Sequence, residues 1–214
     1  MIKYILFDLD GTLTNPKEGI TKCVQHALRH FGIERSCDEL LEFIGPPLKE
    51  QFMKYASLSE EDGEKAVQIY RERFAPIGIF ENEIYEGVIE VMKSLKKAGK
   101  VMAIATSKPT VFAQRIADEY GITPYIDALF GSELDGRNTD KALVIQNAMR
   151  ALGADKENTI MVGDREHDAI GAQKNGIECI GVTYGFAADG ELRKSGVCAL
   201  ANSPYALLEI LSAM

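Results

Sequence analysis

The sequence predicts an α/β protein whose core is a three-layer, Rossmann-like parallel sheet, with a small α-helical domain inserted near the start of the chain. Two observations lead to this fold class. From Gly87 onward, short apolar runs alternate with helices of the length that right-handed crossovers need. Between residues 15 and 82, the apolar residues recur only at helical spacing. A chain of 214 residues can hold both parts.

The first predicted strand is a short apolar run that ends in acidic residues. Ile5, Leu6 and Phe7 are continuous rather than alternating, which is typical of a parallel strand buried on both faces. The run stops at Asp8, and Asp10 follows two positions later. Ligands of open α/β sheets bind at the carboxyl ends of the strands, so this pair predicts a functional site, although a DxDG pattern alone also fits a turn.

Residues 15–82 are predicted to be helical and to form a separate domain. Pro16, Pro47 and Ser59 mark the starts of three helices, and a shorter helix is expected from about Asp38 to Phe43. No strand pattern interrupts them. The predicted division is therefore a helical domain over 15–82 and an α/β core made of 1–14 and 83–214.

The rest of the chain alternates between helix and strand. After a helix that Gly99 ends, further strands are predicted at Val101–Ala105, about Ala128–Gly131, Thr159–Val162 and Cys179–Val182. Amphipathic helices separate these strands, and a last helix is expected after Ser203 and Pro204. The pattern predicts a parallel sheet covered by helices on both faces.

Composition excludes some classes of partner. A net charge of -8 gives no sequence-wide basic surface for a nucleic-acid polymer, although small anionic substrates remain possible. The four cysteines form no CxxC pair, which argues against a zinc site or a disulfide framework. No apolar run approaches the roughly 20 residues of a membrane span, so we expect a cytoplasmic protein without a membrane partner. The sequence leaves the oligomeric state open.

Polar residues follow three predicted strands, and parallel strands bring those ends together. Asp8 and Asp10 follow the first strand, Thr106 and Ser107 follow the second, and Asp164 follows the fourth with Asp168 one helical turn later. Carboxylates gathered at one edge repel each other unless a cation is present, and oxygen ligands indicate Mg²⁺. Strand-end hydroxyls, helix N–H groups and a lysine can bind a phosphoryl group, and Lys141 is the candidate for that lysine.

These motifs closely resemble those of the haloacid dehalogenase superfamily of phosphatases, in the branch that carries a helical (C1-type) cap after the first motif. DLDGT at 8–12 is similar to the first motif, Thr106 to the second, Lys141 to the third, and GDREHD at 163–168 to the fourth. The resemblance covers the whole chain. Within the branch, the chain looks most like phosphoglycolate phosphatase-like and 5'-nucleotidase-like members.

The resemblance implies a role for each motif residue. Asp8 would be the nucleophile that forms an aspartyl phosphate, and Asp10 the general acid and base. Mg²⁺ would be held by Asp8, the Asp10 carbonyl and Asp164. Thr106, the N–H group of Ser107 and Lys141 would bind the phosphoryl oxygens, while Asp168 would orient the metal site or Lys141.

The implied activity is hydrolysis of a small phosphate ester, with phosphoglycolate phosphatase-like activity placed first. A 5'-nucleotidase and a sugar phosphomutase are the enzymatic alternatives, and a catalytically idle phosphate-binding protein is the non-enzymatic one. A phosphorylatable receiver domain shares the acidic cluster, threonine, lysine and Mg²⁺. It lacks an inserted helical bundle, however, and carries its phosphorylated aspartate on a middle strand.

Two further lysines are weaker candidates. Lys49 follows Gly45 and two prolines in the helical domain, where it could set substrate specificity or simply be a solvated lysine. Lys108 follows the Thr106–Ser107 pair and could help bind substrate or only pair with a surface carboxylate, so we rank it second to Lys141.

Overall fold

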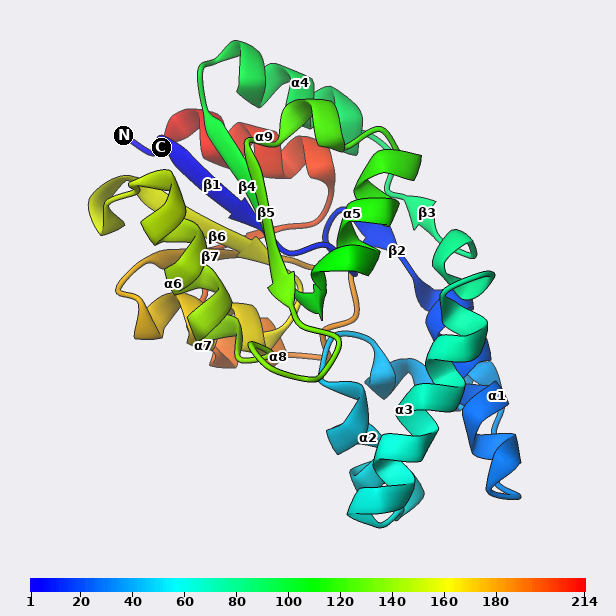
Figure 1. Cartoon of the computed structure of the whole chain (residues 1–214). Coiled ribbons are helices and arrows are strands. Elements are labelled where there is room, and N and C mark those ends of the chain that lie inside the picture. Colours follow the sequence, from blue (N-terminus) through cyan, green and yellow to red (C-terminus); the bar gives the residue numbers. More distant parts are fainter. The chain divides into compact units, whose positions relative to one another are not determined.

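The structure is a computed structural model that describes residues 1–214 and divides into two compact units (Figure 1). The core unit contains Met1–Asn15 and Ile84–Met214, and the helical unit contains Pro16–Glu83. Two short strands, β2 (Thr14–Asn15) and β3 (Glu83–Ile84), pair where the chain passes from one unit to the other. No helix has both the length and the apolar character needed to cross a membrane.

The core unit is built on a six-stranded sheet whose neighbouring strands are all parallel, which confirms the predicted fold class. The order across the sheet is β5-β4-β1-β6-β7-β8. The first strand of the sequence therefore lies inside the sheet, flanked by β4 and β6. The strands are β1 (Tyr4–Phe7), β4 (Val101–Pro109), β5 (Ala128–Ser132), β6 (Thr159–Gly163), β7 (Glu178–Val182) and β8 (Ala199–Ala201).

Helices cover both faces of this sheet (Figure 1). The chain moves outward from β1 to β4 and β5, then returns to β6 and continues to the other edge, so right-handed crossovers place its helices on opposite faces. One layer contains α4 (Val88–Lys97), α5 (Thr110–Glu119) and α9 (Pro204–Ala213). The other contains α6 (Lys141–Leu152), α7 (Glu166–Lys174) and the short α8 (Glu191–Lys194). Two 3₁₀ turns, Thr123–Tyr125 and Lys156–Asn158, lie in the connections.

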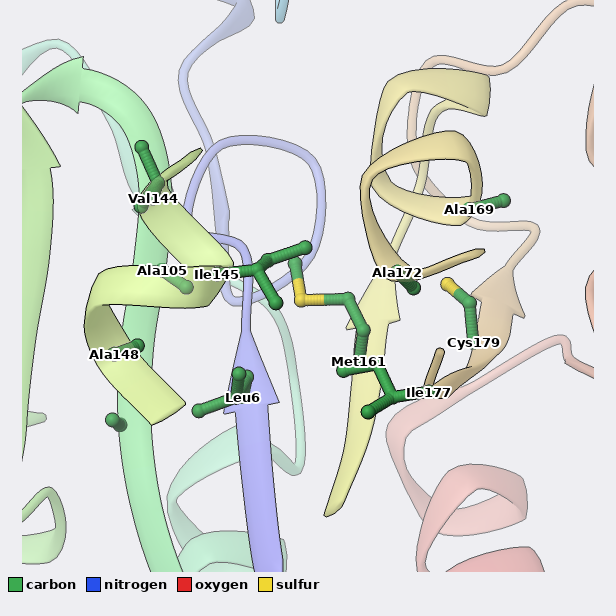
Figure 2. Packing of buried hydrophobic residues seen from close by; sticks show 11 residues of the cluster. Leu6, Ala105, Val144, Ile145, Ala148, Met161, Ala169, Ala172, Ile177 and Cys179 are labelled. Atoms are coloured by element: carbon green, nitrogen blue, oxygen red, sulfur yellow. The ribbon is translucent and has the colours of Figure 1, made fainter. Parts of the chain in front are cut away.

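The apolar core beneath α6 and α7 holds the middle of the sheet rigid. Figure 2 shows Leu6 and Met161 of the strands facing Ile145 of α6 and Ala172 of α7. All four side chains are fully buried. Fixed packing of this kind lets polar groups at the strand ends keep one geometry.

The starts and ends of the helices follow the predicted signals. The Asp140 side chain accepts a hydrogen bond from the Ala142 N–H group at the start of α6, and Gly153 ends that helix in the left-handed conformation. The Ser203 side chain caps α9 in the same way, by accepting from Ala206 N. Local sequence therefore determines where these helices begin.

The helical unit contains α1 (Lys17–His30), α2 (Leu48–Ala56) and α3 (Glu60–Phe74), with 3₁₀ turns at Cys37–Phe43 and Gly78–Phe80. The Ser59 side chain caps α3 by accepting from the Asp62 N–H group. Aromatic side chains pack against each other within this unit, and the ring centroids of Phe43 and Phe52 lie 5.1 Å apart. Each helix has an apolar face that packs inside this unit.

Four elements differ from the sequence prediction. The segment around Asp38–Phe43 is a 3₁₀ helix rather than an α-helix. Strand β4 continues past Ala105 to Pro109 because the following residues pair with β5 after a shift in register. Strand β8 and helix α8 were not predicted, since three and four residues are too few to show periodicity.

Candidate functional site

The register of the sheet brings the predicted site residues to one edge. Phe7 of β1 is level with Ile104 of β4 and Val162 of β6. The residues that follow these three positions are therefore level with each other, and Asp8 lies between the two neighbouring strand ends. The Asp8 N–H group continues the ladder by donating to the Val162 carbonyl at 2.9 Å. Asp8, Thr106 and Asp164 thus share one edge of the sheet.

Lys141 reaches this edge from the first turn of α6. Its Nζ donates to Asp8 Oδ1 at 2.7 Å and to the Ala105 carbonyl at 3.1 Å. It also forms an ion pair with Asp168 Oδ1 at 2.8 Å, although that oxygen accepts no hydrogen bond of regular geometry. Gly171 provides space for the Lys141 side chain, because a Cβ at position 171 would lie 2.9 Å from Lys141 Cγ. The ammonium group is therefore held between two carboxylates.

Both carboxylate oxygens of Asp168 are engaged by the protein. Oδ1 faces Lys141, and Oδ2 accepts a hydrogen bond from the Arg165 N–H group at 3.1 Å, as in a helix capping box. Asp8, Asp164 and Asp168 each offer an oxygen within 4.8 Å of the others, which is close enough for one metal ion. Because the Lys141 ammonium group lies 2.8 Å from Oδ1 and Oδ2 accepts a hydrogen bond, Asp168 is better suited to orient Lys141 than to bind a metal.

Asp164 has one anchored oxygen and one without a protein partner. Its Oδ2 accepts a hydrogen bond from the Phe186 N–H group at 2.8 Å, while the buried Oδ1 has no hydrogen-bond partner. Gly11 and Gly185 make room for the carboxylate, because a Cβ on either would lie within 2.5 Å of Asp164 Oδ2. A buried carboxylate oxygen without a donor is the feature expected of a cation ligand.

Asp10 is paired with the other buried lysine of the site. Lys108 Nζ donates to Asp10 Oδ2, and the side chains are 7% and 10% exposed, respectively, so this pair is shielded from water. Asp10 Oδ1 is buried and has no partner. Lys108 was ranked behind Lys141 from the sequence, yet the fold places both ammonium groups on aspartates of the same motif.

Thr106 and Ser107 lie beside these groups on β4. Thr106 is buried, and its Oγ1 accepts a hydrogen bond from the Lys108 N–H group at 3.3 Å. The Ser107 hydroxyl points away, donating to the Thr139 carbonyl at 3.1 Å. The side chain of Ser107 is thereby engaged elsewhere, and a phosphate contact through its N–H group stays a prediction.

The electrostatics of the cluster favour a cation. Burial raises the pKa of Asp164, and the nearby charges of Asp168 and Asp8 raise it further. Burial also raises the pKa of Asp10, against the opposing effect of Lys108. Burial alone would lower the pKa of Lys141, but the charges of Asp168 and Asp8 outweigh it and raise that pKa. Four carboxylates thus face two ammonium groups, and a divalent cation would balance the remaining charge.

Lys49 lies in the helical unit and has partners there. Its Nζ donates to Glu60 at 2.9 Å and to Glu64 at 2.8 Å, which joins α2 to α3. These carboxylates raise the pKa of Lys49, a group at the surface. A specificity role for Lys49 stays a prediction.

The family of the chain follows from comparison with known proteins. A family model described as haloacid dehalogenase-like hydrolase matches residues 5–182. The chain belongs to this family. The matched residues include the four aspartates of the acidic edge, from Asp8 to Asp168, whereas Gly185 and Phe186 lie just beyond the match.

Two relatives of this haloacid dehalogenase-like protein are named as a 5'-nucleotidase and a pyrophosphatase. A 5'-nucleotidase of Pseudomonas aeruginosa is 46% identical over 190 residues, which cover 88% of this chain and 86% of the relative. Pyrophosphatase PpaX of Halalkalibacterium halodurans is 32% identical, covering 98% of this chain and 97% of the relative. A crystal structure of a predicted phosphatase from Clostridium acetobutylicum superposes with a TM-score of 0.97 at 43% identity, with complete coverage of both chains. The protein is a phosphatase-type hydrolase of this family.

The structure adds residues that the motifs did not predict. Gly185 and Phe186 contact Asp164 from a loop more than twenty positions later in the chain. The Tyr184 hydroxyl donates to the Thr12 carbonyl at 3.0 Å, so the same loop also contacts the first motif. A strand followed by a glycine-containing loop was visible in the sequence, but its nearness to Asp164 depends on the order of the strands in the sheet.

Proposed function

We propose that the protein hydrolyses phosphate monoesters through an aspartyl phosphate on Asp8, with Mg²⁺ as cofactor. The observation that carries this proposal is the position of Asp8, buried at the end of β1 with Lys141 Nζ 2.7 Å from its Oδ1. A lysine held there can bind a phosphoryl oxygen of the substrate next to the nucleophile. Thr106 and the Ser107 N–H group provide further contacts from β4.

The residues account for each proton and bond in the reaction. Asp8 attacks phosphorus, and the bond from phosphorus to the ester oxygen breaks while Asp10 gives that oxygen a proton. Asp10 then takes a proton from the water that attacks the aspartyl phosphate, which releases inorganic phosphate and restores Asp8. The Asp8 carboxylate, the Asp10 carbonyl and Asp164 would hold Mg²⁺, which would reduce the repulsion between the anionic substrate and the carboxylates.

Nucleoside monophosphates are the substrate class that we propose first. This order differs from the one suggested by the motifs, which placed phosphoglycolate first. The reason is that the 5'-nucleotidase of Pseudomonas aeruginosa is 46% identical over most of both chains, whereas the pyrophosphatase is 32% identical. Phosphoglycolate and sugar phosphates remain the alternatives, since every such ester presents the same phosphoryl group to the core.

Phosphate release from a substrate panel tests this proposal. The panel contains nucleoside monophosphates, phosphoglycolate, sugar phosphates, pyrophosphate and p-nitrophenyl phosphate, each with Mg²⁺ and with a chelator. We expect metal-dependent release with the highest kcat/KM on a nucleoside monophosphate. Higher kcat/KM on phosphoglycolate would reverse the substrate order, and release that persists in chelator would contradict the metal assignment.

Replacing the nucleophile tests the mechanism separately from the substrate. Asp8→Asn should lower kcat by about 10⁴-fold or more while the fold is retained, because the amide is a poor nucleophile. Asp38→Asn, at an exposed position in the helical unit that forms no part of the site, is the matched control because it makes the same change of side chain. Turnover by Asp8→Asn at a rate near that of the wild type would exclude the aspartyl phosphate.

A further inference from the structure

A loop from Tyr184 to Gly190 passes directly over Asp164. Phe186 N–H donates to Asp164 Oδ2 at 2.8 Å, the hydrogen bond that fixes the direction of this carboxylate. The backbone of Gly185 lies close to Asp164 and Gly11, because a Cβ at position 185 would be 2.4 Å from Asp164 Oδ2 and 2.5 Å from the Gly11 carbonyl oxygen. A small displacement of this loop would therefore displace Asp164.

Glu191, at the start of α8, anchors the far end of the loop. Its Oε2 accepts a hydrogen bond from the Ala188 N–H group at 2.9 Å. Its Oε1 accepts from the Glu166 N–H group at 2.8 Å and from Arg165 Nε at 2.9 Å. The carboxylate thereby joins the loop to the two residues that directly follow Asp164.

The pair formed by Glu191 and Arg165 is well shielded from solvent. Each side chain is only 10% exposed. Every contact of the Glu191 carboxylate named above comes from an N–H donor, so a charged acceptor matches its surroundings. Charge-assisted hydrogen bonds in such a position hold their geometry better than surface pairs do.

We propose that Glu191, together with Arg165, is a positioning residue that sets the affinity of Asp164 for its divalent cation. Glu191 fixes Ala188, the loop then places Gly185 and Phe186 against Asp164, and Asp164 Oδ1 is left available to the cation. Glu191 itself makes no contact with Asp164. The inference rests on the proposed function, because it assumes that Asp164 is a metal ligand.

Glu191→Gln separates this role from simple stabilisation of the fold. An amide has one acceptor oxygen, so a glutamine that keeps its oxygen toward Arg165 and Glu166 turns its NH₂ group toward the Ala188 N–H donor. The loop contact is lost while the size of the side chain is kept. Asp189→Asn is the matched control, because Asp189 is exposed on the same loop and its replacement removes the same charge.

The measurement is Mg²⁺ binding to the protein by calorimetry, without substrate, at a temperature where every variant is folded. We expect Kd for Mg²⁺ to rise by about tenfold in Glu191→Gln, in line with the loss of other groups that orient metal ligands. The control should bind as the wild type does. The rise in Tm on adding Mg²⁺ should also be smaller in Glu191→Gln, since it depends on the same Kd.

The outcomes distinguish this inference from the proposed function. If the wild type bound no Mg²⁺, or if Asp164→Asn bound it unchanged, the metal assignment of the proposed function would fail. If the wild type binds Mg²⁺ and folded Glu191→Gln binds it equally well, the positioning role is overturned. Should Glu191→Gln not fold, Glu191→Asp keeps the charge but is one methylene too short for all three contacts, and wild-type affinity in that variant would overturn the role as well.

Discussion

The two buried lysines of the site differ in how the fold holds them. Lys141 comes from the first turn of α6 and contacts Asp8, Asp168 and the Ala105 carbonyl, which belong to three separate elements. Lys108 comes from the end of β4 and pairs with Asp10, two residues beyond Asp8. Both side chains are 7% exposed. The two lysines are therefore equally buried but hold different aspartates of the first motif.

This difference indicates different tasks. A lysine fixed by several partners is pre-organised to bind a phosphoryl group, because little entropy is lost when the substrate arrives. A lysine paired with Asp10, the proposed proton donor, can instead affect how that residue is placed. Substitutions at the two lysines and at the carboxylates that they contact would test this contrast.

Lys141→Met should have the largest effect of the lysine variants. It removes the phosphoryl contact and leaves Asp8 and Asp168 facing each other without a cation. We expect kcat/KM to fall by about 10³-fold and the free energy of unfolding to fall by about 3 kcal/mol. Steady-state kinetics and urea denaturation measure the two effects, with the exposed Lys174→Met as control. A loss of less than about tenfold in kcat/KM would show that Lys141 is not a main phosphate ligand.

Asp168→Asn should weaken the anchoring of Lys141 without removing it. One oxygen becomes an NH₂ group that must face either the Lys141 ammonium or the Arg165 N–H donor, so one contact is lost. We expect kcat/KM to fall by about 10- to 100-fold. In the double variant with Lys141→Met, the two losses should not add, because both act through the same ammonium group. Additive losses would contradict the orienting role of Asp168.

Lys108→Met should have a smaller effect on stability than Lys141→Met. Asp10 loses its cation, but burial already raises the pKa of Asp10, so the carboxyl can take up a proton instead of staying charged. We expect a loss of about 1 kcal/mol in the free energy of unfolding and about tenfold in kcat/KM. A stability loss equal to that of Lys141→Met would remove the distinction between the two lysines.

Glu191 and Arg165 form a shielded ion pair that lies outside the proposed substrate contacts. Burial would raise the pKa of Glu191, but Arg165 and the N–H groups of Ala188 and Glu166 outweigh it and lower that pKa. Because the pKa of Glu191 is lower in the folded chain than in the unfolded chain, where it is about 4.3, the charged carboxylate stabilises the fold at pH values above 4.3. This contribution is lost as the pH falls through the pKa of the folded chain. The free energy of unfolding of the wild type should exceed that of Glu191→Gln by about 1 to 3 kcal/mol at pH 7. Urea denaturation should show that this difference shrinks below about pH 4. A constant difference across pH would mean that the charge of Glu191 contributes nothing.

The sequence by itself determined the fold class and the location of the candidate site. Continuous apolar runs are typical of buried parallel strands, and the polar residues directly after them had to lie at one edge of the sheet. Asp8, Thr106 and Asp164 could be placed together for this reason, and the helix start at Ser203 could be predicted because capping is a local interaction.

Only the tertiary structure decided which partners these residues have. Nothing in the sequence indicates that Lys108 pairs with Asp10, that Phe186 fixes Asp164, or that Glu191 accepts a hydrogen bond from the Glu166 N–H group. These contacts join segments more than twenty positions apart, and they depend on strand order, the register shift in β4 and the close approach that Gly11 and Gly185 allow. Local patterns predict elements because periodicity and capping act over a few residues, whereas pairing between distant side chains is fixed only when the elements pack.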